Sequence, residues 1–158
     1  MNSKLFTLPH LFKILFMLGT AVVVHLAYVT SFYIVFGSNY QDTTFNNYDA
    51  YVRLIPIIML ASFVVADYLQ MPRFFRKKNI EVVSQSLKFT TLITLITISA
   101  KDLLLARAFP RSVIVISYVI MLCYVFVWEL ICAFISHKLY ENGELVITMA
   151  DGTVIAVP

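Results

Sequence analysis

The chain has 158 residues, of which 60% are hydrophobic and only 13% are charged, and its formal net charge is +3. A soluble domain has roughly 45 to 50% apolar and about 25% charged residues, so an ordinary water-soluble domain is excluded. The basic residues flank apolar blocks instead of lining one polar surface, and we therefore expect no binding of nucleic acid. The composition predicts an all-α membrane protein whose first partner is membrane lipid.

The first apolar block, residues 14–36, predicts a transmembrane span. It holds no acidic or basic residue except His25. Its length at a rise of about 1.5 Å per residue is about 35 Å, enough to cross a hydrocarbon layer of about 30 Å. Lys4 and Lys13 precede it, as in a signal peptide. The run is longer than the about 7 to 15 apolar residues of such a peptide and no A-x-A-like site follows, so we expect an uncleaved anchor.

A polar segment, residues 37–51, separates this span from the second, which we place at residues 52–69. The second block begins with Arg53 and Pro56, and proline is tolerated in a first helical turn because no intrahelical donor is lost there. A basic cluster follows directly, and such a cluster beside a span marks a cytoplasmic loop. Its members are Arg73, Arg76, Lys77 and Lys78.

The third span, predicted at residues 82–106, is the least apolar of the four. Lys88 and the neighbouring Lys101 and Asp102 interrupt it. We expect the two lysines to snorkel toward opposite interfaces, because their long aliphatic stems can stay in lipid while the ammonium groups reach water.

The fourth span, predicted at residues 112–135, contains Glu129 as its sole charged residue. Cys123 and Cys132 lie nine positions apart in this span. A helix turns about 100° per residue, so the two side chains point to opposite faces and cannot form a disulfide within the helix. We expect free thiols.

The residues after the fourth span break the helical pattern. Beyond Asn142 and Gly143, β-branched residues surround Asp151 and Gly152, which is a two-residue hairpin signal. An isolated hairpin is marginal in water, so this tail either packs on a partner or on loops near the membrane, or is the stub of a further domain. The predicted fold is thus a four-transmembrane-helix bundle, residues 1–138, with a short cytoplasmic β-hairpin-like tail, residues 139–158.

The distribution of basic residues predicts the orientation. Eight lie on one side of the membrane and four on the other, and the richer side should be cytoplasmic, which places both termini in the cytoplasm. The eight are Lys4, Lys13, Arg73, Arg76, Lys77, Lys78, Lys88 and Lys138. The four are Arg53, Lys101, Arg107 and Arg111.

Polar groups inside spans are costly and are candidates for function. His25 lies near the middle of the first span, where it is either a proton or ligand group or, as we favour, a hydrogen-bond partner of a neighbouring helix. Asp67 and Glu129 are placed toward the cytoplasmic ends of their spans. They either pair at the interface with Arg73, Arg76 or Lys138, or form a polar vestibule beside basic residues that contact lipid phosphate. The residues expected to make this contact are Arg73, Arg76, Lys77 and Lys78.

Two further features belong to the third span. Lys101 and Asp102 differ by about 100° around the helix, so we expect them to reach different partners, such as Asp42 or Arg53, as an outer clamp between spans two and three. A polar stripe on one face favours close helix packing, with a permeation path as the alternative. The stripe consists of Thr90, Thr94, Thr97 and Lys101.

Motifs for nucleotide or metal binding are absent from the sequence: it has no G-x-G-x-x-G, P-loop, C-x-x-C or H-E-x-x-H. No nucleophile, base and orienting group stand in a readable constellation. We therefore expect no catalytic activity within these residues, no metal and no cofactor.

Several local features follow one another in a characteristic order along residues 10–140. They are Asp67-Tyr68 closing the second span, the basic turn 73–78, the lead from Glu81 to Lys88, the run Phe109-Pro110-Arg111-Ser112, and Trp128 in the fourth span. In this layout the chain resembles the N-terminal membrane region of bacterial polyprenyl-phosphate sugar-1-phosphate transferases, which initiate exopolysaccharide and capsule synthesis. It departs from the pattern at Glu129, where a basic residue is expected after the tryptophan.

The resemblance implies a four-helix anchoring, lipid-organising or oligomerising module in a bacterial inner membrane. In that family, a nucleotide-fold-like domain and a catalytic domain with an Asp-Glu dyad follow the membrane region. The implied partners are undecaprenyl phosphate, a cytoplasmic glycosyl phosphotransferase domain or subunit, and a second copy of the chain. The alternatives are a small four-span transporter or flippase-like protein for a lipid-linked sugar, with His25, Asp67 and Glu129 lining the path, and an accessory subunit with structural contacts alone.

The orientation is tested by labelling single cysteines in a chain that lacks Cys123 and Cys132. A cysteine in place of Asn46 should react with a membrane-impermeant reagent added from outside. One in place of Asn79 should react only after permeabilisation, because the basic loop beside it is predicted to be cytoplasmic. The reverse pattern would contradict the orientation.

Overall fold

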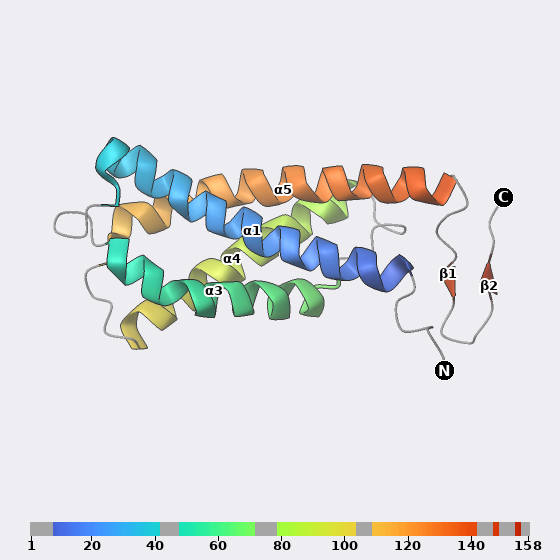
Figure 1. Cartoon of the computed structure of the whole chain (residues 1–158), viewed down its shortest axis with the longest axis horizontal. Coiled ribbons are helices and arrows are strands. Elements are labelled where there is room, and N and C mark those ends of the chain that lie inside the picture. Colours follow the sequence, from blue (N-terminus) through green and yellow to red (C-terminus); the bar gives the residue numbers. More distant parts are fainter. Residues whose placement is uncertain are drawn as a thin grey trace.

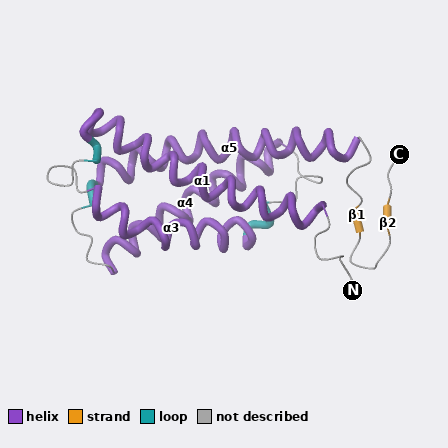
Figure 2. The backbone as a smooth tube through the Cα atoms, viewed as in Figure 1, coloured by secondary structure: helices purple, strands orange, loops and turns teal. Residues whose placement is uncertain are grey.

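The structure is a computed structural model, and it describes residues 8–41, 48–71, 79–103, 109–141, 147–148 and 154–155. Helices dominate these residues (Figures 1 and 2). In chain order, the elements are α1 (Leu8–Phe36), a single 3-10 turn η1 (Gly37–Asn39), α3 (Tyr48–Tyr68), α4 (Asn79–Leu103), α5 (Arg111–Glu141), β1 (Ile147–Thr148) and β2 (Val154–Ile155).

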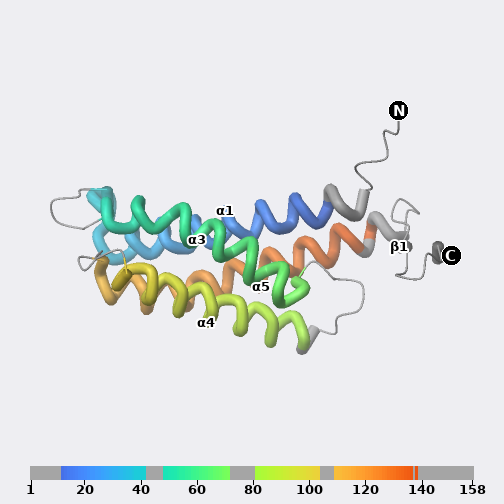
Figure 3. The backbone as a smooth tube through the Cα atoms, turned by 90° about the horizontal axis from the view of Figure 1, so that it is seen from below, coloured from blue at the N-terminus to red at the C-terminus, as the bar shows by residue number. Residues whose placement is uncertain are grey.

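The four long helices form an antiparallel bundle. α1 packs against α3 and α5, and α4 packs against the same two helices, so the bundle closes on itself. α1 begins, α3 ends, α4 begins and α5 ends at one end of the bundle, which we call the Asp67 end (Figures 1 and 3). The opposite end, where the chain turns through η1, is called the η1 end.

All four helices are long and apolar enough to cross a membrane. The segments that meet this criterion are Phe12–Asn39, Tyr48–Tyr68, Glu81–Leu103 and Arg111–Ser136. Large apolar side chains on the outside of the bundle suit contact with lipid: Leu60 is 66% exposed and Val115 is 67% exposed. The prediction of a multi-pass membrane protein with four spans is confirmed, with boundaries a few residues from those expected.

Most hydroxyl groups inside the bundle bond to their own helix. The hydroxyls of Thr20, Ser31, Ser62 and Thr97 each donate to the carbonyl oxygen four residues earlier, at 2.6 to 2.9 Å. This local bond satisfies a polar group that lipid could not. Small hydroxyl residues can therefore line the interior and let the helices approach closely. Three members of the predicted polar stripe on α4 are buried, Thr90, Thr94 and Thr97, and the fourth, Lys101, is partly buried.

α3 ends in a Schellman motif that is built without glycine. Gln70 has φ of 54° and its N–H donates to the carbonyl of Asp67, while the N–H of Met71 reaches back to the carbonyl of Ala66. Met71 and Ala66 are both fully buried and supply the apolar contact that accompanies this motif. The cap fixes the direction in which the chain leaves α3, directly before the basic cluster.

The tail after α5 contains one short antiparallel pairing. Ile147 faces Ile155 and Thr148 faces Val154 across β1 and β2 (Figure 2). Two residue pairs do not establish a folded hairpin, and the turn expected at Asp151 lies outside the described residues. The β-hairpin-like tail therefore stays a prediction.

The left-handed backbone conformation of Gln70 leads to a prediction about the stability of the bundle. Gln70→Gly should stabilise the bundle by about 1 kcal/mol, because a side chain in this region costs roughly that much and glycine does not. The measurement is the thermal midpoint of helix unfolding in detergent, followed by circular dichroism.

The matched control is Gly37→Ala in η1. Gly37 has φ of 68° and open space around it, so the added methyl group strains the backbone without any clash. The control should lower the midpoint where Gln70→Gly raises it. A fall with Gln70→Gly would contradict the assigned cap.

Candidate functional site

Two contacts between helices hold the Asp67 end of the bundle together. Lys13 Nζ of α1 lies 2.6 Å from Asp67 Oδ1 of α3, and both side chains are about half exposed. Gln85 Nε2 of α4 donates to the carbonyl of Leu69, just after α3, at 3.1 Å. The two bonds therefore join α1, α3 and α4 at the same position along the bundle axis. An exposed ion pair of this kind contributes little stability, about 0 to 1 kcal/mol, so its main effect is to set the register.

Asp67 has an ion-pair partner that the sequence analysis did not name, Lys13, which lies 54 positions away. The expected pairing with Arg73 or Arg76 stays a prediction, because both lie outside the described residues. Lys138 instead places its Nζ 5.0 Å from the centre of the Phe134 ring. The four residues expected to contact lipid phosphate lie outside the described residues. They are Arg73, Arg76, Lys77 and Lys78.

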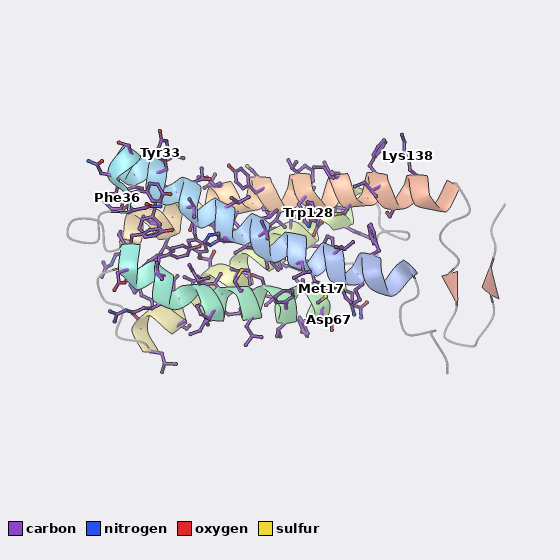
Figure 4. All side chains as sticks on the ribbon, in the orientation of Figure 1. Met17, Tyr33, Phe36, Asp67, Trp128 and Lys138 are labelled. Carbon is purple, nitrogen blue, oxygen red and sulfur yellow. The ribbon has the colours of Figure 1, made fainter. Side chains whose placement is uncertain are left out.

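Trp128 locks α5 onto α1 near the Asp67 end. Its indole N–H donates to Thr20 Oγ1 at 3.2 Å, and its ring stacks on Phe16 with centroids 6.3 Å apart. The ring lies so close to Gly19 that a Cβ there would come within 2.1 Å of Cζ2. Glycine is therefore required at position 19 for this approach. Figure 4 shows Trp128 level with Met17 and Asp67 along the bundle.

Glu129, beside Trp128, is 1% exposed and lies in the bundle interior. The expected pairing of Glu129 with Arg73 or Arg76 stays a prediction, because both arginines lie outside the described residues. Met121, Val125 and Cys132 are buried on the same face of α5, so the helix turns Glu129 inward with them. A buried carboxyl group in a membrane bundle is costly and is a functional candidate by default.

Further polar atoms are buried on α4, the helix that packs beside α5. Ser86 and Thr90 are fully buried and Thr94 is 9% exposed. Their hydroxyl oxygens, and Gln85 Oε1, have no hydrogen-bond partner among the described residues. These atoms differ from the other buried serine and threonine hydroxyls among the described residues, which bond to their own helix.

The η1 end is closed by hydrogen bonds and aromatic rings. Tyr51 of α3 bonds to His25 Nδ1 of α1 at 2.5 Å, which confirms that His25 bonds to a neighbouring helix. The hydroxyl of Tyr28 donates to Thr97 Oγ1 of α4 at 2.8 Å. Around them, Phe32, Tyr48, Tyr51 and Phe109 meet at centroid distances of 5.1 to 6.3 Å. This end is a packed core.

The charges at the η1 end pair locally. Lys101 Nζ lies 3.8 Å from Asp102 Oδ1, although we expected neighbours on the helix to reach different partners. Arg53 pairs with Asp49 one turn away at 2.9 Å. The flexible lysine stem lets adjacent residues meet in spite of the angle between their Cα–Cβ bonds, so the predicted clamp between spans two and three is not formed by these described pairs.

Sequence reasoning missed several residues that organise the bundle. The close approach of Gly19 and Trp128 had one signal, a lone glycine in the middle of a span, because small residues mark helix contacts in membranes. No signal in the sequence marked the inward position of Glu129. Apolar residues surround α5 on all sides, so its sequence pattern does not distinguish an inner face. Cys132 is buried and Cys123 is exposed, and both are free, as predicted.

No protein-family model, curated protein or solved structure matches the chain. Among the described residues, no three His, Cys, Asp or Glu side chains are placed to hold a metal ion together.

The contact between Gly19 and Trp128 predicts a coupled effect of two substitutions. Gly19→Ala should destabilise the bundle, because overpacking costs about 1 to 3 kcal/mol and alanine gains only about 1 kcal/mol over glycine in a helix. Replacing the indole ring by a smaller side chain, in the double variant Gly19→Ala/Trp128→Leu, should recover part of the stability lost in Gly19→Ala. Thermal unfolding in detergent measures both effects. Additive effects of the two single substitutions would show that the residues do not meet.

Proposed function

We propose that this chain is a non-catalytic membrane module of bacterial surface-polysaccharide biosynthesis. It anchors or organises a sugar-phosphate transferase beside a polyprenyl phosphate such as undecaprenyl phosphate, in the inner membrane and with both termini in the cytoplasm. The observation that carries the proposal is the common exit of two segments: the chain between α3 and α4, which is basic, and the end of α5 both leave the bundle at the Asp67 end (Figure 1).

The segment between α3 and α4 has the chemistry for a lipid phosphate. It contains two arginines and two lysines within six positions, residues 73–78. Basic residues beside an anionic membrane surface contribute about 1 kcal/mol each to its attraction. Arginine also forms bidentate hydrogen bonds with phosphate. Both flanks are anchored, by the Schellman cap at Gln70 and by the bond from Gln85 to Leu69.

The end of α5 suits the attachment of a partner on the same face. The membrane-crossing part of α5 ends at Ser136, and the helix continues to Glu141, about 8 Å farther along its axis. A transferase domain or subunit bound at the tail, residues 142–158, would meet the same membrane face as the basic segment. Such an arrangement would bring the enzyme close to the phosphate of its lipid acceptor.

The residues that carry the family resemblance hold the bundle together. Asp67 pairs with Lys13, Trp128 packs on Gly19, and Phe109 is 2% exposed within the aromatic core. Contacts between helices of this kind fit an anchoring module, whose task is to keep a fixed shape in lipid.

The proposal is tested with paired charge substitutions. Arg76→Gln/Lys77→Gln should weaken binding of a fluorescent polyprenyl phosphate to the purified chain in micelles. Two lost charges correspond to about 2 kcal/mol, or roughly thirtyfold in affinity. The matched control, Arg53→Gln/Arg111→Gln, removes two exposed charges at the η1 end and should leave affinity unchanged. In parallel, a glycosyl phosphotransferase should co-purify with the tagged wild-type chain from bacterial membranes.

Three outcomes would contradict the proposal. Equal loss of binding in both double variants would show that the basic segment is not the site. Transfer of sugar phosphate to polyprenyl phosphate by the purified chain alone would refute a non-catalytic role. Translocation of a lipid-linked sugar in proteoliposomes, abolished by His25→Ala or Glu129→Gln, would establish the carrier alternative instead.

A further inference from the structure

Three polar residues lie on the outside of the bundle near the start of α4, and we call them the outer polar face. They are Glu81, Ser84 and Lys88, and all three are exposed. A helix turns about 100° per residue, so these side chains and the exposed Leu95 fall within about 60° of one another. The buried hydroxyl residues of α4, such as Thr90, lie on the opposite side of the helix. The outer polar face therefore points away from the other helices.

The two charges of the outer polar face have no partner among the described residues. None of the ion pairs between described residues includes Glu81 or Lys88. They do not pair with each other, because seven positions place them about 10 Å apart along the axis, whereas helical ion pairs form between residues three or four apart. At the same end of the bundle, by contrast, Lys13 pairs with Asp67.

The helix itself accounts for Glu81 but not for Lys88. Glu81 is in the first turn of α4, where the partial positive charge of the helix N-terminus favours an acidic residue. This effect falls off within one turn, so it does not reach Lys88. Lys88 lies inside the segment Glu81–Leu103 that is apolar enough to cross a membrane. A charge on the lipid side of a span is costly, so this ammonium group calls for an anion beside the helix.

The direction of the side chains brings Lys88 and Ser84 to one ligand. Side chains of a helix lean toward its start, and α4 starts at the Asp67 end (Figure 3). The Lys88 ammonium group therefore leans toward Ser84, which is one turn nearer that end on the same face. Both groups can donate hydrogen bonds, and a phosphate oxygen can accept both. Glu81, nearer still to the end of the bundle, can only accept when it is ionised, so it suits a cationic donor.

The order of these groups along α4 matches the order of groups in one class of lipid. From the middle of the span toward the Asp67 end, the helix presents Leu95, which is 54% exposed, then the donors Lys88 and Ser84, and then the acceptor Glu81. A phospholipid with an ethanolamine head group has acyl chains, then a phosphate, then a primary ammonium group nearer water. Each charged group of the lipid thus meets a group of opposite charge.

Other lipid phosphates match this face less well. Phosphatidylglycerol has the phosphate but no cation for Glu81. A phosphate monoester, as in a polyprenyl phosphate, carries roughly −1.5 to −2 charges, which one lysine beside a carboxylate does not balance. The four basic residues within positions 73–78 suit such a monoester better.

We propose that the outer polar face of α4 binds phosphatidylethanolamine. Lys88 and Ser84 bind the phosphate of the lipid, and Glu81 binds its ammonium group. The site is separate from the basic segment and does not depend on the proposed role in polysaccharide synthesis.

The test measures lipid binding to the purified full chain. The chain in detergent micelles is titrated with phosphatidylethanolamine or phosphatidylglycerol of the same acyl chains, and native mass spectrometry of the lipid adducts gives each dissociation constant. Phosphatidylethanolamine should bind about fivefold more tightly, since one charge at a membrane surface contributes about 1 kcal/mol. Added polyprenyl phosphate should not displace it.

Substitutions separate the two halves of the head group. Lys88→Gln should weaken binding of both phospholipids about fivefold, and Ser84→Ala should weaken both by less. Glu81→Gln should weaken phosphatidylethanolamine alone and so remove the preference. The matched control is Lys138→Gln, which removes an exposed lysine at the same end of the bundle from α5 and should change neither affinity.

The wild-type chain decides the question even where a variant does not fold. Equal affinity of the wild type for the two phospholipids would overturn the proposal. Equal losses in Lys88→Gln and Lys138→Gln would show that binding depends on overall charge and not on this face. Displacement of phosphatidylethanolamine by polyprenyl phosphate, together with weaker polyprenyl phosphate binding in Lys88→Gln, would assign the face to the monoester instead. Loss of polyprenyl phosphate binding in Arg76→Gln/Lys77→Gln alone concerns only the proposed function.

Discussion

A polar group inside a membrane has to find its partner within the protein, because lipid offers neither donors nor acceptors. This constraint explains most of the specific contacts of the bundle. Most buried serine and threonine hydroxyls bond to their own helix, Tyr51 bonds to His25, and Trp128 bonds to Thr20. Apolar contacts alone would not select one arrangement of helices, since the lipid tails are as apolar as the side chains. Hydrogen bonds, small residues and close packing therefore select the register of the helices.

The two ends of the bundle meet this constraint differently. At the η1 end, large aromatic rings fill the space between helices, and Tyr28 and Tyr51 turn their hydroxyl groups toward partners on other helices. At the Asp67 end, the contacts are a charged pair, a side-chain bond to a carbonyl group and a helix cap. The η1 end is thus a core packed with aromatic rings, whereas the Asp67 end combines polar contacts between helices with the basic segment and the tail that follow it in sequence.

The sequence by itself determined the number of spans, their approximate limits, the free cysteines and the bonding of His25 to another helix. These properties follow from length, hydrophobicity and the cost of a lone polar group in lipid, all of which are local. The tertiary structure decided that Asp67 pairs with Lys13, that Lys101 pairs with Asp102, and that Glu129 faces inward. In a span that is apolar all round, lipid-facing and protein-facing positions have the same composition, so no pattern marks the inner face. Only the placement of the neighbouring helices assigns each polar side chain its partner.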